Sequence, residues 1–276
     1  MFLAIGIVIG LVLGLTGSGG SVFAVPLLVL AAGVSMHQAV GLSLAAVAAS
    51  AVFGTFRNRN KSTVLWIPAV FLSATGMIAA PFGQWLAGHI SQSVLMVSFA
   101  ILAVIIALRM WYQARKHPEL AAITRASEDT SENSDGYVCR LSPTGQFEFK
   151  PRCMSGLIVG GLVVGILSGL FGVGGGFVIV PLLLLLSQIS MQQAVGTSLV
   201  VISVISSIAF ISYLVMAPPL ADTLPYETIG WLVAGGFAGM FVGQLLTKKI
   251  AGAKLQKGFA FALIVMAMLM IVFHKS

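Results

Sequence analysis

The sequence predicts an all-α polytopic membrane protein made of two inverted-topology repeats. Each repeat should hold a glycine-broken or re-entrant helix pair plus about three spanning helices. The chain is 58% hydrophobic and only 8% charged, whereas soluble domains carry about 25% charged residues. Asp, Glu, Lys and Arg are absent from three runs, at 1–56, 62–108 and 153–221. Uncharged apolar runs longer than about 18 residues indicate membrane-spanning helices.

One stretch of the chain occurs twice. Residues 10–44 and 165–199 align without a gap, and roughly half of the aligned positions are identical. Each copy runs from an apolar segment through a glycine cluster and a short proline-containing segment to the patch Ser-Met-x-Gln-Ala-Val-Gly-x-Ser-Leu. Helix-breaking glycines at matching places in two halves of a membrane protein indicate a binding site.

The first repeat should begin with an apolar segment at 2–16, which its glycine cluster ends. The next segment, 22–32, is too short to cross about 30 Å at 1.5 Å per residue. The two segments together predict a broken helix or a re-entrant hairpin, which is tolerated only inside protein or beside a wet cavity. Further spans are expected at 36–56, 64–87 and 93–112.

The region 115–152 differs in kind, because it holds six of the eight acidic residues among Ser, Thr and Gly. We therefore divide the chain into a first membrane repeat (1–114), a polar connector (115–152) and a second membrane repeat (153–276). The second repeat should follow the order of the first, with segments at 154–168, 177–187, 192–215, 228–247 and 258–273.

Loop charges orient the two halves, because cytoplasmic loops collect Lys and Arg. The loop with Arg57, Arg59 and Lys61 should be cytoplasmic, and its counterpart with Asp222 and Glu227 should lie outside. The next pair of loops reverses this bias. The loop near His89 in the first half is uncharged, whereas its counterpart in the second half carries Lys248, Lys249, Lys254 and Lys257. This inversion predicts that the two halves cross the membrane with opposite topologies. It also predicts a cytoplasmic connector and both termini outside.

The cysteines and the net positive charge indicate no separate function. Cys139 and Cys153 lie outside the predicted membrane segments, the nearest of which begins at residue 154, and we expect no structural disulfide if the connector is cytoplasmic. The net charge of +7 is explained by topology signals and contact with anionic lipid. We expect the lipid bilayer as a partner and no nucleic acid.

Enzyme chemistry has no residues to support it. The apolar runs contain no paired carboxylates, no Ser-His-Asp set and no His/Cys cluster for a metal. The glycine clusters lack the Lys-Ser/Thr that follows the last glycine of a nucleotide-binding P-loop. We expect no enzymatic activity, no metal and no cofactor.

The remaining chemistry is that of backbone dipoles. Each glycine cluster precedes a short helix, whose unpaired N–H groups and positive dipole end favour an anion. Glycine lets a ligand approach the backbone, and neighbouring neutral side chains could add donors. The predicted substrate-binding residues are Gly17, Ser18, Gly19, Gly20, Ser21, Gln38, Ser43, Gly172, Gly174, Gly175, Gly176, Gln193, Thr197 and Ser198.

Each group has a structural alternative. Ser43 and Ser198 could instead bond carbonyls of their own helices. The glycines spaced by four residues, at 161, 165 and 169 and at 235, 239 and 243, suit close helix packing. Such small-residue stripes would also permit a homodimer.

The paired motif Gly-Leu-x-Gly-x-Gly-Gly, Val-Pro-Leu-Leu and Gln-Ala-Val-Gly-x-Ser-Leu resembles the TauE/SafE (sulfite exporter) transporter family. The resemblance covers nearly the whole chain except the central loop. It implies a bacterial-type inner-membrane, multi-pass carrier for a sulfur oxyanion or organosulfur anion, such as sulfite or an organosulfonate. A related thiosulfate-transporting group is associated with pathway cysteines, which the apolar runs here lack.

Besides a channel, against which turnover that saturates with substrate would argue, three functions follow from these observations. The first is an exporter or facilitator that binds a small sulfur-containing anion at paired half-helix N-termini near the midplane. The second is an importer of a related sulfur or carboxylate anion through the same site. The third is a non-transporting membrane scaffold whose connector docks a soluble partner.

Overall fold

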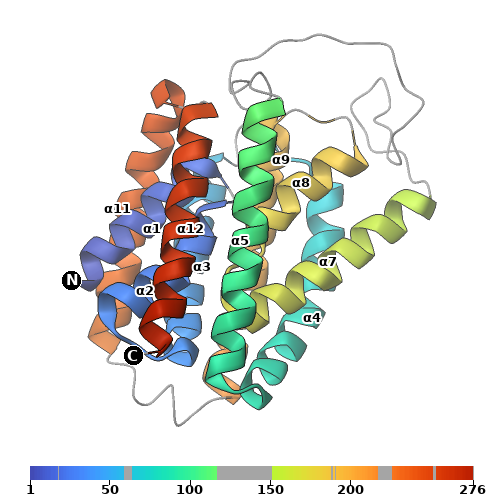
Figure 1. Cartoon of the computed structure of the whole chain (residues 1–276). Helices are drawn as coiled ribbons and strands as arrows, with labels where there is room; N and C mark the ends of the chain where they lie inside the picture. Colours follow the sequence, from blue (N-terminus) through green and yellow to red (C-terminus); the bar gives the residue numbers. More distant parts are fainter. Residues whose placement is uncertain are drawn as a thin grey trace.

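The computed structural model describes residues 1–17, 19–58, 64–116, 151–187, 189, 191–216, 226–250 and 253–275. Within them the chain is a bundle of α-helices (Figure 1). Six of the described helices are long and apolar enough to cross a membrane. The predicted all-α membrane fold is therefore confirmed, while the connector lies almost wholly outside the described residues.

The helices follow the predicted order in both halves. The first half contains α1 (Phe2–Thr16), the 3-10 helix η1 (Gly19–Phe23), α2 (Ala24–Ala32), α3 (Met36–Asn58), α4 (Trp66–His89) and α5 (Gln92–Lys116). The second contains α7 (Pro151–Phe171), α8 (Gly176–Leu186), α9 (Met191–Met216), α11 (Tyr226–Ile250) and α12 (Ala253–Lys275).

The first break begins where α1 ends at Gly17, a residue with φ 69° whose N–H donates to the Leu13 carbonyl at 2.7 Å. The chain then forms η1 before α2, which has nine residues. A nine-residue helix is about 14 Å long and cannot cross the bilayer. The predicted break is confirmed, although Val22 belongs to η1 rather than to the short α-helix.

The second break has a different backbone. Gly172, Gly174 and Gly175 have φ values of 70°, 68° and 69°, and α8 follows directly with eleven residues. Residues with a side chain rarely adopt this left-handed backbone conformation, so glycine at these positions permits the turn. The two repeats therefore break their first helix at equivalent positions with different turns.

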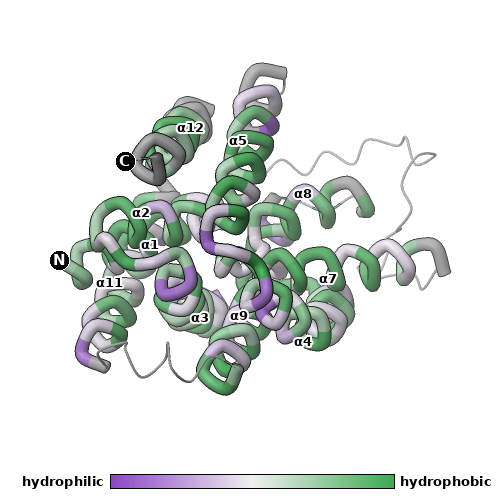
Figure 2. The backbone as a smooth tube through the Cα atoms, turned by 60° about the horizontal axis from the view of Figure 1, so that its bottom comes forward, coloured by the Kyte–Doolittle hydropathy of each residue, from purple (hydrophilic) through white to green (hydrophobic). Residues whose placement is uncertain are grey.

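The packing of the helices is reciprocal between the halves. α1 packs along α11, and its counterpart α7 packs along α4. α3 and α9 contact each other at the centre, and α5 pairs with α12. Figure 2 shows α3 and α9 between the α1/α11 pair on one side and the α4/α7 pair on the other. Each half thus supplies a helix to the other half's packing.

Glycines make the close approach of these pairs possible. A Cβ on Gly10 of α1 would collide with the Gly236 carbonyl of α11 and lie 2.8 Å from the Met240 nitrogen. A Cβ on Gly165 of α7 would collide with the Gly76 carbonyl of α4. The small-residue spacing in α7 and α11 therefore serves packing between helices of one chain.

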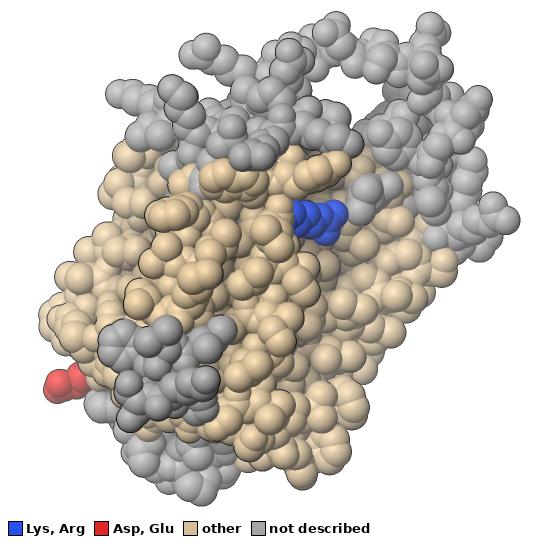
Figure 3. Space-filling model, viewed as in Figure 1, with Lys and Arg blue, Asp and Glu red and all other residues tan. Residues whose placement is uncertain are grey.

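The outer surface is apolar and mostly uncharged, as a lipid-facing surface must be. On the face in Figure 3, a single Lys or Arg patch lies near one end and an Asp or Glu patch near the other. Large apolar side chains stand exposed between the ends of the helices, among them Ile78 at 75% and Val70 at 60%. The bulk of the described surface suits a hydrocarbon environment.

One expectation from the sequence needs correction. Cys153, near the start of α7, is disulfide-bonded and buried, whereas we expected no structural disulfide. The chain's other cysteine, Cys139, lies outside the described residues. The expectation failed because it depended on the compartment of the connector rather than on the placement of the thiols.

Candidate functional site

The two glycine breaks meet inside the bundle, where α8 contacts η1. Gly17 packs against Val195 of α9, and Gly172 packs against Val40 of α3. Val40 and Val195 occupy the same position of the repeated Gln-Ala-Val-Gly patch. Each break therefore sits on the polar patch of the other half.

Serine hydroxyls tie each break to that patch. The Ser43 hydroxyl lies 2.6 Å from the Gly172 carbonyl oxygen and 3.0 Å from that of Val40. The Ser198 hydroxyl lies 3.4 Å from the Gly17 carbonyl oxygen and 2.9 Å from that of Val195. The predicted alternative, a bond to the serine's own helix, is therefore present together with a bond across the two halves.

Two other candidates from the sequence support helix ends. The Gln38 side-chain oxygen accepts from the Ser35 N–H at 3.3 Å and from the Ser35 hydroxyl at 3.1 Å, while the Gln38 N–H donates to that hydroxyl at 3.4 Å. This is a capping box at the start of α3. The Thr197 hydroxyl accepts from the Leu65 N–H at 3.0 Å, which anchors the start of α4 on α9.

The other candidates lie at or beside the breaks. Ser21 is fully buried in η1, and Gly20 packs so closely on the backbone of α1 that a Cβ would lie 2.5 Å from the Val12 carbonyl carbon. Gly19 begins η1 and Gly176 begins α8. Gln193 lies in the first turn of α9, and Ser18 lies outside the described residues.

The second break presents a helix N-terminus to the interior. Gly175 is the N-cap of α8, and no side chain among the described residues caps that end. The Gly175 carbonyl accepts from Val178 and Ile179 at 3.0 and 3.3 Å, so the first turn is formed. Its leading N–H groups and the positive end of the helix dipole favour an anion. In the first half, η1 occupies the equivalent place before α2.

The sequence interpretation missed four polar side chains near the breaks. Ser168, Ser206 and Gln84 are buried, and each has a side-chain oxygen with no hydrogen-bond partner among the described residues. The side-chain nitrogen of Gln244 likewise has no hydrogen-bond partner within the described part of the chain. The recurring Gly-Gln pair, at 83–84 and 243–244, was a usable signal for the glutamines, whereas neither serine recurs in the other repeat.

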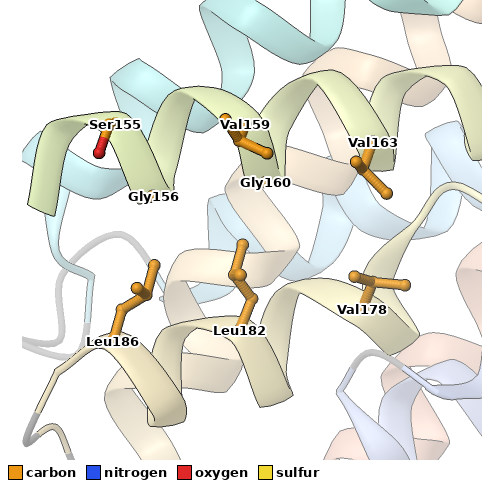
Figure 4. A pocket seen from close by; sticks show the side chains of 8 residues that line it. All are labelled: Ser155, Gly156, Val159, Gly160, Val163, Val178, Leu182 and Leu186. Atoms are coloured by element: carbon orange, nitrogen blue, oxygen red, sulfur yellow. The ribbon is translucent and has the colours of Figure 1, made fainter. Parts of the chain in front are cut away.

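A groove of about 440 Å³ opens elsewhere, between α7 and α8. Figure 4 shows Val159 and Val163 of α7 facing Leu182 and Leu186 of α8 across it. Apart from the hydroxyl of Ser155, the lining offers no donors or charges, so the groove suits hydrocarbon rather than an anion. Among the described residues, no group of three or more His, Cys, Asp and Glu side chains could hold a metal ion.

Known proteins match the chain over most of its length. The family model described as "Sulfite exporter TauE/SafE" matches residues 2–270. A "Probable membrane transporter protein" of Xylella fastidiosa (strain 9a5c) is 29% identical over 274 residues, which cover 97% of this chain and 92% of that protein.

More distant relatives carry the same description. A "Probable membrane transporter protein" of Haemophilus influenzae is 25% identical over 282 residues, which cover 96% of this chain and 95% of that protein. No solved structure matches the chain significantly. With a family match across nearly the whole chain and six described helices long and apolar enough to cross a membrane, this chain belongs to the Sulfite exporter TauE/SafE family and is a membrane transporter, not an enzyme.

Proposed function

We propose that this transporter exports a small sulfur-containing anion, such as sulfite or an organosulfonate, across a bacterial-type inner membrane. The observation that carries the proposal is the meeting of the two glycine breaks, with the uncapped N-terminus of α8 beside them. The family description supports sulfite as the first substrate to test.

The backbone supplies the binding groups in this proposal. Gly17, Gly19 and Gly20 shape the site from the first repeat, and Gly172, Gly174, Gly175 and Gly176 shape it from the second. Ser43 and Ser198 hold the breaks in place through their bonds to glycine carbonyls. Ser21, Gln38, Gln193 and Thr197 complete the polar surroundings in this proposal, and Ser18 is proposed as a binding residue from its position in the sequence alone.

Neutral donors suit an anion that must leave again, because a fixed cation could hold it too long. The apolar runs carry no Asp, Glu, Lys or Arg, and transporters coupled to protons or sodium commonly use an intramembrane carboxylate. An inside-negative potential favours anion exit by about 2.3 kcal/mol per charge per 100 mV. Export therefore needs no dedicated coupling residue.

The repeats are proposed to have inverted topology, with a cytoplasmic connector and both termini outside. The reciprocal pairing of α1 with α11 and of α7 with α4 supports a two-fold relation between the halves. The reversal of loop charges supports a two-fold axis in the plane of the membrane. The disulfide at Cys153 opposes a cytoplasmic connector, because disulfides persist in oxidising compartments, and labelling of the loops from either side of the membrane decides between the two.

Sulfite flux in proteoliposomes tests the proposal. Wild type should show saturable flux, and Gly175→Ala should lower it at least tenfold, because Gly175 has a positive φ and caps α8. Gly33→Ala is the matched control, since Gly33 also has a positive φ but nothing lies within 4 Å of an added Cβ. Absence of sulfite flux from folded wild type would remove this substrate and direct the search to other sulfonates, thiosulfate and carboxylates.

An importer of a related sulfur or carboxylate anion would use the same site in the opposite direction. Reversing the imposed membrane potential in the same proteoliposomes separates the two directions. Export requires net outward flux at inside-negative potential without an added ion gradient. The chemistry of the site is the same in both cases.

A further inference from the structure

Three buried polar side chains on the helices next to the second break have a side-chain atom without a bonding partner among the described residues. Ser168 and Ser206 are 0% exposed and Gln84 is 7% exposed. Within the described residues, nothing hydrogen-bonds to the two serine hydroxyls or to the Gln84 side-chain oxygen. Burying such groups unpaired is costly, so a cluster of them calls for an explanation.

Ser206 points directly at the break. An ideal Cβ on Gly174 would lie 2.7 Å from the Ser206 hydroxyl oxygen and 3.2 Å from Ile202. The hydroxyl on α9 therefore faces the backbone of the residue that precedes the N-cap of α8. Only the absence of a side chain at Gly174 leaves room beside this hydroxyl.

Ser168 approaches the same turn from α7. It lies one helical turn after Val164, which packs against Gly175, and residues four apart share a helix face. The Ser168 carbonyl accepts from the Gly172 N–H at 2.9 Å. Ser168 thus belongs to the last turn before the break, on the face that looks back at the start of α8.

Gln84 lies on the other side of that last turn. An ideal Cβ on Gly169 would lie 2.8 Å from the Gln84 backbone nitrogen, which places α4 against α7 at this level. The Gln84 atom that lacks a partner among the described residues is an acceptor oxygen, so Gln84 borders the break without being assigned to an anion.

The first repeat shows that packing does not need these hydroxyls. The residues equivalent to Ser168 and Ser206 are Leu13 and Ala51, and both are fully buried. The same helix arrangement is thus built with apolar side chains in one half and with unpartnered serines, within the described residues, in the other. The two hydroxyls are therefore an addition of the second repeat, and a polar ligand at the break would supply the partners that they lack among the described residues.

We propose that Ser168 and Ser206 form an oxyanion-binding subsite with the N-terminus of α8. Two hydroxyls and the leading N–H groups of α8 supply several neutral donors at the second break. Such a set fits an anion with several oxygens, of the sulfite or sulfonate type, better than a halide. The inference rests on the proposed function, which it extends to named side chains.

Binding measurements on the full-length protein in lipid nanodiscs test the subsite. Titrations with sulfite, methanesulfonate and chloride by calorimetry would compare wild type with Ser206→Ala and Ser168→Ala. Each substitution should weaken sulfite and methanesulfonate binding about tenfold, because each removes one hydrogen bond to a charged ligand. Chloride should bind more weakly than either oxyanion.

Ser203→Ala and Ser207→Ala are the matched controls on α9. Their hydroxyls already donate within the helix, from Ser203 to the Val200 carbonyl at 2.7 Å and from Ser207 to the Ser203 carbonyl at 2.6 Å. Both controls should bind as wild type does. The melting temperature without ligand reports any purely structural effect, which would appear without a change in the oxyanion titration.

The outcomes separate the subsite from the proposed function. If wild type binds no oxyanion, water alone fills the site and the proposed subsite is wrong. Saturable sulfite flux with unchanged binding in Ser206→Ala and Ser168→Ala also overturns it and leaves the proposed function standing. Oxyanion binding that both substitutions weaken, without any flux, supports the subsite and removes the proposed transport of that anion.

Discussion

At the scale of single residues, the breaks depend on backbone conformations that glycine adopts at low cost. Every positive φ among the described residues belongs to a glycine, and four of the five are in the breaks. Gly172 is also constrained by its neighbours, because a Cβ there would lie 2.6 Å from the Ser43 hydroxyl and 2.8 Å from the Val40 backbone. The conformation and the lack of space act together at this position.

Substitution of Gly172 tests this combination. Gly172→Ala should destabilise the protein by about 2–4 kcal/mol, from about 1–2 kcal/mol of backbone strain and a further cost of overpacking. Gly33→Ala shares the strain but meets nothing within 4 Å, so it should cost only about 1–2 kcal/mol. Denaturation in detergent measures both, and equal losses would contradict the role of Ser43 and Val40.

The serine bonds across the halves make a second prediction at this scale. Ser43→Ala should cost about 1–3 kcal/mol, because it leaves the buried Gly172 carbonyl without its 2.6 Å donor. Ser198→Ala should cost less, since its bond to Gly17 is longer, at 3.4 Å. Thermal unfolding of the two variants in one detergent gives the order, and a larger loss for Ser198→Ala would refute it.

At the scale of elements, glycine faces let helices of opposite halves touch along their backbones. Gly83 of α4 packs against the Ile166 carbonyl of α7, whereas Gly88, further along the same helix, has open space around it. Packing in a membrane relies on such close contact, because lipid already solvates apolar side chains. The two glycines therefore form an internal comparison within one helix.

Valine at these two positions should give different results. Gly83→Val should destabilise the protein by about 1–3 kcal/mol through overpacking, with lower yield of folded protein. Gly88→Val should change stability by less than about 0.5 kcal/mol. Size-exclusion profiles and melting temperatures provide the measurement, and a harmless Gly83→Val would mean that α4 and α7 separate easily.

At the scale of the whole molecule, loop charge and reciprocal packing together predict opposite orientations for the two halves. In a chain with Cys139 and Cys153 replaced by serine, an impermeant thiol reagent on intact cells should label Ala221→Cys and leave Ser62→Cys unlabelled. Permeabilised cells should give labelling of both, which controls for reactivity. Labelling of Ser62→Cys in intact cells would place that loop outside and reverse the proposed topology.

Energetics of the whole molecule lead to a prediction about coupling. Because the apolar runs contain no carboxylate, flux of the anion should follow voltage and ignore a sodium gradient. A potential of 100 mV is worth about 2.3 kcal/mol per charge, which corresponds to a roughly 50-fold concentration ratio for a monovalent anion. Flux in proteoliposomes that required sodium and was indifferent to voltage would exclude this mechanism.

The sequence by itself determined the features that local chemistry controls. Uncharged apolar runs located the spanning helices, and glycine clusters located both breaks to within a few residues, because hydropathy and backbone freedom act over one or two turns. The glycines spaced by four in α7 and α11 were correctly interpreted as packing surfaces. The start of α2 was missed, since a 3-10 turn and an α-helix share the same composition there.

Only the tertiary structure decided which distant groups meet. That Ser43 bonds Gly172, 129 residues away, and that α1 pairs with α11 depend on how the halves interlock. The unpartnered state of Ser168 and Ser206 within the described residues likewise had no signal in the repeat, because a serine in a membrane helix usually bonds its own backbone. Spatial proximity and burial are properties of the packed chain. The local sequence pattern could therefore locate the breaks but could not predict which side chains lie next to them.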